Sequence, residues 1–97
     1  MASGTIKKAR YMPLDESKSW GNVDLNDFTA SGLYKLSGNI SHNAGGNNYG
    51  ILEVLKFADT HITQIFYGVD DDAHIYKRAF RNGTWYNWYS FTGTQVT

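Results

Sequence analysis

One segment near the C-terminus reads Gly83-Thr84-Trp85-Tyr86-Asn87-Trp88-Tyr89-Ser90-Phe91. Nearly every residue in it has high strand propensity, so the segment predicts one aromatic β-strand. Alternation along such a strand sends Trp85, Asn87, Tyr89 and Phe91 to one face, and Tyr86 and Trp88 to the other. A domain this small needs only one aromatic face for its core, so we expect a loop, a partner chain or a ligand to cover the other.

The segments before it predict an antiparallel meander. Asn82-Gly83 tolerates positive φ at both central positions of a type I′ turn, so this dipeptide joins the aromatic strand to the preceding one. Strand-like runs separated by short turns favour neighbouring antiparallel strands. About five strands are expected, the other four at residues 33–37, 51–58, 61–69 and 74–81.

Two further features complete the expected fold, which is mainly β with one short helical turn. Leu25 and Phe28, in the Asn- and Asp-rich residues 21–28, have the spacing of a single helical turn. Residues 38–50 contain four glycines and four asparagines, a composition typical of a long surface loop. Apolar side chains fall on both faces of the strands. We expect Trp20, Leu25 and Phe28 to cover one face, and a partner chain or ligand to meet the other.

Length and composition narrow the class of protein. The chain of 97 residues fits one domain, which we divide into an extended lead-in, residues 1–20, and a β domain, residues 21–97. The formal net charge is zero, which argues against binding to duplex nucleic acid or to an anionic membrane. The absence of cysteine excludes disulfides and thiolate metal sites. No apolar run is long enough to span a bilayer.

The N-terminal residues carry three smaller expectations. The first four residues look like a start or leader sequence, and Pro13 disfavours a helix or central strand around it. The basic cluster of Lys7, Lys8 and Arg10 is more typical of a solvated segment than of a site.

Several possible chemical motifs also have simpler structural interpretations. The three carboxylates of residues 70–72 suggest calcium, but without the spacing of a calcium loop an exposed acidic turn is the better interpretation. The three histidines lack the spacing of a zinc site. Glu53 with an aspartate could form a glycosidase pair, although a mid-strand glutamate is usually solvated or pairs across strands. Arg78 is expected to stack on an aromatic neighbour rather than bind single-stranded nucleic acid. No metal or cofactor is expected.

Four pieces of the chain together resemble the knob-like domains near the tips of bacteriophage tail fibres and R-type pyocin fibres. They are residues 24–26 shortly before Gly-Leu-Tyr at 32–34, the Gly/Asn loop followed by Gly-Ile-Leu-Glu-Val at 50–54, Thr-Gln-Ile-Phe-Tyr at 63–67, and residues 75–78 before Gly-Thr-Trp-Tyr-Asn-Trp at 83–88. The resemblance covers residues of about 21 to 91. It implies a small domain of a homotrimeric fibre protein on the virion, which contacts saccharides of the host cell surface and is not an enzyme. Two alternatives stay open: a spacer or trimerisation module without its own ligand, and an envelope-degrading enzyme.

The residues themselves suggest how a saccharide would be bound. Flat aromatic rings pack on the C–H faces of a sugar, while Asn, Asp and His bind its hydroxyls. The same aromatics could instead form the sheet core and the seam between subunits, and we favour that role for all three, most of all for Trp85. The candidate ligand-binding residues come from the aromatic segment, the strand and acidic turn before it, and the Gly/Asn loop: Tyr86, Trp88, Trp85, Tyr76, His74, Asp71, Asn47 and Asn48.

Overall fold

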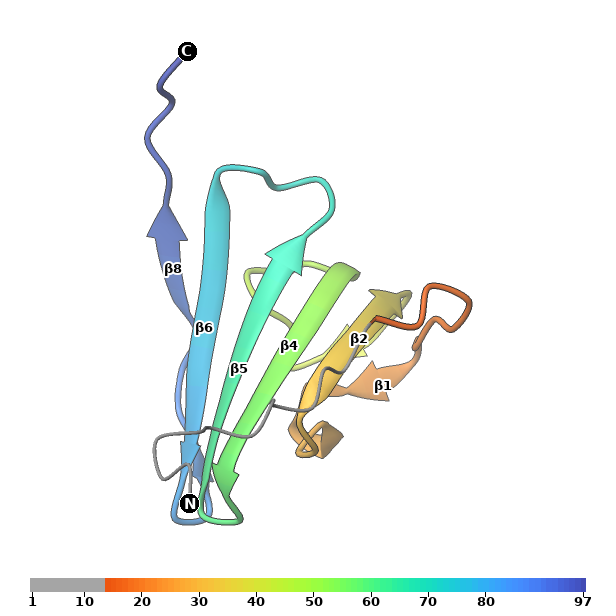
Figure 1. Ribbon diagram of the computed structural model, residues 1–97, viewed down its shortest axis with the longest axis vertical. Coiled ribbons are helices and arrows are strands. Elements are labelled where there is room, and N and C mark those ends of the chain that lie inside the picture. Colours follow the sequence, from red (N-terminus) through yellow and green to blue (C-terminus); the bar gives the residue numbers. More distant parts are fainter. Residues whose placement is uncertain (1–13) are drawn as a thin grey trace, which may run out of the picture.

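The computed structural model describes residues 14–97, and its main element is a twisted antiparallel sheet. Its long strands are β2 (Gly32–Ser37), β4 (Tyr49–Ala58), β5 (His61–Gly68) and β6 (His74–Arg81), side by side in that order (Figure 1). Two short strands, β7 (Thr84–Trp85) and β8 (Tyr89–Thr92), both pair with β6. The predicted mainly β fold with an antiparallel meander is confirmed. Residues 1–13, with the expected leader, basic cluster, Pro13 and most of the lead-in, lie outside the described residues.

The prediction of one continuous aromatic strand is wrong. Phe80 pairs with Trp85 and Lys77 pairs with Tyr89, so the three residues 86–88 lie opposite only two residues of β6. One extra residue on one strand is a β-bulge, and it reverses the alternation beyond it. Trp88 therefore lies on the same face as Trp85 rather than opposite it. The turn before this segment has positive φ at both central residues, Asn82 (50°) and Gly83 (90°), as the sequence predicted.

The core lies on one face of the sheet, beneath a cover formed by the residues on either side of β2, 20–31 and 38–48. This cover contains the parallel pair β1 (Val23–Asp24) and β3 (Ile40–Ser41) and a single 3₁₀ turn, η1 (Leu25–Asp27). Asp24 caps the turn, because its carboxylate accepts the N–H of Asn26 at 2.9 Å. The predicted helical turn and the covering role of Trp20, Leu25 and Phe28 are confirmed. The buried apolar side chains are Leu25, Phe28, Leu36, Ile40, Ala44, Leu52, Val54, Ile62 and Phe66.

The Gly/Asn segment, residues 38–50, is partly buried. Ile40 and Ala44 are buried in the core, and Tyr49 and Gly50 already belong to β4. Composition alone suggested exposure, but two apolar side chains among glycines and asparagines are enough to hold the segment on the sheet. The predicted loop is therefore partly buried rather than wholly on the surface.

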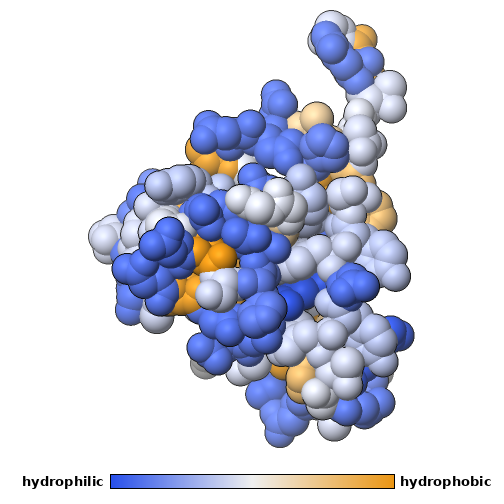
Figure 2. Space-filling model, turned by 180° about the vertical axis from the view of Figure 1, so that it is seen from behind, coloured by the Kyte–Doolittle hydropathy of each residue, from blue (hydrophilic) through white to orange (hydrophobic). Residues whose placement is uncertain are grey.

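The opposite face of the sheet, which we call the outer face, exposes apolar side chains. Leu55, Tyr67, Ile75, Tyr89 and Phe91 each keep between 39% and 66% of their surface exposed. Ile75 and Phe91 are direct cross-strand partners, so this apolar surface continues from β6 onto β8. On the covered side, seen in Figure 2, apolar surface is limited to small areas between polar ones, and the C-terminal segment projects beyond the sheet.

Candidate functional site

Arg78 lies on β6 with its side chain turned into the covered face, and only 4% of the residue is exposed. Its Nε donates a hydrogen bond to Gln64 Oε1 at 2.8 Å. Gln64 is itself fully buried, and its Nε2 donates to the carbonyls of Leu25 (2.7 Å) and Phe28 (2.9 Å). Gln64 thus links the 3₁₀ turn of the cover to the guanidinium on the sheet.

Two tryptophans enclose the same guanidinium. Its central carbon lies 4.0 Å from the ring centroid of Trp85 and 4.8 Å from that of Trp88. The β-bulge makes this possible, because it brings both rings to the face on which Arg78 lies. The prediction that Arg78 stacks on an aromatic neighbour is confirmed. Trp88 is fixed further, since its indole Nε1 donates to the carbonyl oxygen of His42 at 2.9 Å.

The charge of Arg78 has no ion-pair partner within residues 14–97. Burial lowers the pKa of Arg78 to about 10, and the charge of Asp24 opposes this only in part. The side chain therefore stays cationic at neutral pH. Among residues 14–97, its buried Nη2 has no hydrogen-bond partner, and the same is true of the buried Oδ1 of Asn26. Unsatisfied buried polar atoms are rare in folded proteins, and each one calls for a partner.

Both unsatisfied residues line a cavity of about 350 Å³, which we call the arginine cavity. Its wall comes from η1, the Gly/Asn segment, β6 and the bulged aromatic segment, and consists of Asn26, His42, Arg78, Trp85, Tyr86, Asn87 and Trp88. Tyr86, 44% exposed, stacks on a second cation, with its ring 4.1 Å from the guanidinium of Arg81. The cavity combines aromatic surface, amide groups and a cation, which suits non-covalent recognition of a polar ligand.

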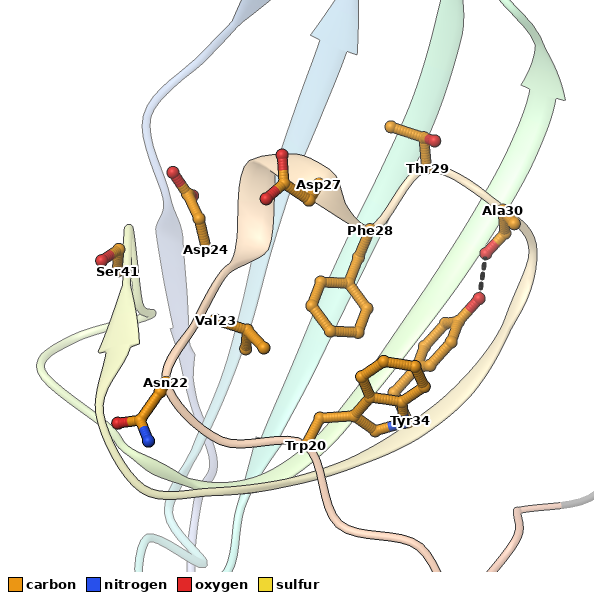
Figure 3. Close-up of a pocket in the computed structure, with 10 residues that line it drawn as sticks. All are labelled: Trp20, Asn22, Val23, Asp24, Asp27, Phe28, Thr29, Ala30, Tyr34 and Ser41. Atoms are coloured by element: carbon orange, nitrogen blue, oxygen red, sulfur yellow. Dashed lines mark hydrogen bonds between the residues drawn. The ribbon is translucent and has the colours of Figure 1, made fainter.

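A larger hollow of about 630 Å³ lies beside the cover (Figure 3), and we call it the acidic hollow. Figure 3 shows three aromatic rings gathered at one side of it, from Trp20, Phe28 and Tyr34, with the carboxylates of Asp24 and Asp27 at the other. The rings pack edge to face with centroids 4.9–6.1 Å apart, so each ring packs mainly against the other two. The hollow therefore offers carboxylates rather than open stacking platforms.

Asp24 connects the two sites, because it lines the acidic hollow and contacts His42 of the arginine cavity. The two atoms, Asp24 Oδ1 and His42 Nδ1, are 2.7 Å apart. Desolvation raises the pKa of Asp24, but the hydrogen bonds from the Asn26 N–H and from His42 outweigh it, so the pKa is lowered overall. Asp24 is thus ionised at neutral pH and contributes negative charge beside the arginine cavity.

A third group of polar side chains surrounds Asp71 in the acidic turn. Its two carboxylate oxygens contact His74 Nδ1 at 2.7 Å and accept the hydroxyl of Tyr76 at 2.8 Å. The hydrogen bond with His74, then that with Tyr76, lowers the pKa of Asp71. Asn47 lies near this group and donates to the carbonyl of Ala44 at 2.7 Å. These polar atoms largely satisfy one another.

The predicted site residues therefore divide into three sets. Trp85, Tyr86 and Trp88 come together at the arginine cavity, whereas Tyr76, His74, Asp71 and Asn47 form the group around Asp71. Asn48 stands apart, because its Oδ1 accepts from Ile40 N and Asn43 Nδ2 within the Gly/Asn segment.

The sequence did not assign four residues of the cavity to the site: Asn26, His42, Arg78 and Asn87. The available signal was the alternation on β6, which places Arg78 on the same face as Phe80 and Tyr76. The bulge that brings Trp88 beside Arg78 left no comparable signal in the sequence.

The described residues give less support to a metal site, to catalysis by Glu53 or to a membrane-spanning helix. Residues 14–97 contain no group of three or more His, Asp or Glu side chains placed to hold one metal ion. Glu53 lies on the outer face, where its carboxylate accepts the hydroxyl of Tyr67 at 2.9 Å, and it lines neither cavity. Over the same residues, no helix has the length and apolar character needed to cross a bilayer.

No protein-family model, curated protein or solved structure matches the chain.

Proposed function

We propose that this domain is a non-enzymatic module that binds saccharides of a host cell surface, displayed on a phage tail fibre or related fibre. The arginine cavity is the observation that supports this proposal most. It presents the rings of Tyr86 and Trp88 together with the amides of Asn26 and Asn87 and a buried cation. Aromatic faces pack on the C–H surface of a sugar, and amides exchange hydrogen bonds with its hydroxyls.

The experiment measures the affinity of monovalent oligosaccharides, identified first by screening bacterial surface glycans with the labelled domain. Tyr86→Ala removes an exposed ring of the cavity, and Trp88→Ala removes the ring that also stacks on Arg78. We expect either change to weaken binding at least about tenfold, a loss of roughly 1.4 kcal/mol. Circular dichroism and thermal melting check the fold of each variant.

Tyr89→Ala is the matched control, because Tyr89 is an exposed aromatic of the same segment on the outer face. Its monovalent affinity should equal that of the wild type. Unchanged binding in Tyr86→Ala and Trp88→Ala would reject this surface as the site. Release of reducing sugar by the wild-type domain would reject the non-enzymatic role.

The outer face favours a second candidate function, in which the domain assembles copies of itself in the fibre. Half-exposed apolar side chains gather on β5, β6 and β8, whereas apolar residues on the surface of a monomer are usually scattered singly. The occupant would be the same face of neighbouring copies in a homotrimer, as the family resemblance implies. Sedimentation equilibrium of the wild type and of Phe91→Lys tests this assembly. A wild-type trimer that becomes a monomer when lysine replaces Phe91 supports the second function. A wild-type domain that stays monomeric at high concentration contradicts it.

A further inference from the structure

The inference concerns which kind of saccharide the arginine cavity accepts, and it rests on the proposed function. Arg78 is a buried cation with no ion-pair partner among residues 14–97 and with an unsatisfied Nη2. Burying a charge is costly unless that charge is paired and hydrogen-bonded. The guanidinium therefore lacks an anionic partner among these residues.

The guanidinium is also held in place before any ligand arrives. Gln64 occupies its Nε, and the rings of Trp85 and Trp88 lie against it. The Nη nitrogens therefore carry the donors that Gln64 does not use, and the buried Nη2 has no partner among residues 14–97. Such preorganisation lowers the entropic cost of binding. Arginine donors in a fixed fork match the geometry of a carboxylate.

We propose that the arginine cavity binds the carboxylate of an acidic sugar residue, with Arg78 as the residue that selects it. A carboxylate supplies both the missing negative charge and an acceptor for Nη2. A hydroxyl supplies no charge and accepts a weaker hydrogen bond. At about 350 Å³ the cavity lies near the lower end of the roughly 300–1,000 Å³ of small-molecule sites. It therefore suits a single sugar residue.

The surrounding charges favour a carboxylate over a phosphate. Asp24, hydrogen-bonded to His42 at the cavity wall, interacts electrostatically with Arg78 and repels an incoming anion. That repulsion grows with the charge of the ligand, and a phosphate monoester carries up to about twice the charge of a carboxylate at neutral pH. Arg81, stacked on Tyr86, adds positive charge near the same wall. One net negative charge on the ligand fits this balance best.

The test uses bacterial polysaccharides in three matched forms: untreated, with carboxyl groups chemically reduced to alcohols, and with phosphates removed. Carboxyl reduction changes the charge while keeping the sugar ring. We expect the wild-type domain to lose at least about tenfold in affinity after carboxyl reduction and to keep its affinity after dephosphorylation.

Arg78→Gln removes the cation but keeps an N–H that can donate to Gln64. In this variant the untreated and carboxyl-reduced polysaccharides should bind equally. Arg78→Lys, which keeps the charge without the planar fork, should retain part of the difference. Titration of the wild type followed by NMR adds a readout that needs no variant: the Nε–H signal of Arg78 and the indole N–H signal of Trp88 should shift with ligand.

Each outcome of these binding and NMR experiments either supports or overturns the proposal. Three results would overturn the inference and leave the proposed function standing. They are binding that survives carboxyl reduction, binding that disappears on dephosphorylation, and a preference of Arg78→Gln for the untreated over the carboxyl-reduced polysaccharide. Saturable binding without a shift of the Arg78 signal also overturns it. If no polysaccharide binds in any form, the inference and the proposed function fall together.

Discussion

Gln64→Met should be among the most destabilising conservative substitutions in this domain. Methionine has nearly the length of glutamine, so packing is largely preserved while all three hydrogen bonds of the Gln64 side chain are lost. Two neutral bonds at about 1 kcal/mol each and one to a charged donor at about 2 kcal/mol give a loss of about 4 kcal/mol. A domain of this size has roughly 5–15 kcal/mol of stability in all.

The assay is thermal unfolding followed by tryptophan fluorescence. The thermal midpoint should fall by about 20 °C, at roughly 4–8 °C for each kcal/mol. Gln95→Met is the matched control, because Gln95 is exposed in the C-terminal segment, and we expect it to change stability by less than about 0.5 kcal/mol.

A double variant tests the reasoning more sharply. Removing Gln64 alone leaves the Nε of Arg78 without a partner, but Gln64→Met combined with Arg78→Met removes both groups. The double variant should therefore lose about 2 kcal/mol less than the two single losses added together. A Gln64→Met loss below about 1 kcal/mol would refute the view that Gln64 joins the cover to the sheet, and strict additivity would refute its coupling to Arg78.

Other substitutions probe the close contacts and the acidic turn. Gly50→Ala should cost about 3 kcal/mol by overpacking, since a Cβ there would lie 2.3 Å from the backbone oxygen of Tyr67. A Cβ at Gly46 meets no atom of residues 14–97 within 4 Å, so Gly46→Ala should cost only about 1 kcal/mol for its positive φ. Equal losses of the two variants in chemical unfolding would contradict this. Asp71→Asn should lower the thermal midpoint at neutral pH and lose that effect in acid. The folded-state pKa of Asp71 lies below its ordinary value of 3.8, so its contribution is present above about pH 5 and disappears as pH falls through the folded pKa. A difference between Asp71→Asn and wild type that persists at pH 2 would exclude this origin.

Local patterns predicted much of the fold. The Asn82-Gly83 turn, the pairing of the long strands and the 3₁₀ turn at Leu25 depend on propensities and periodicities that act over a few residues. The site was predicted only in part. Trp85, Tyr86 and Trp88 do share one cavity, but Asp71 and Tyr76 belong to a separate group.

The amino-acid sequence by itself determined that this chain forms a small aromatic antiparallel sheet with apolar side chains on both faces. Only the tertiary structure decided that a one-residue bulge brings Trp88 to the face of Trp85, and that both enclose Arg78. The physical reason is that a bulge is stabilised by contacts distant in sequence. Trp88 donates to the carbonyl of His42, 46 residues away, and Gln64 reaches Leu25 across 39 residues. Such contacts exist only once the cover has packed on the sheet, so no local pattern along the chain encodes them.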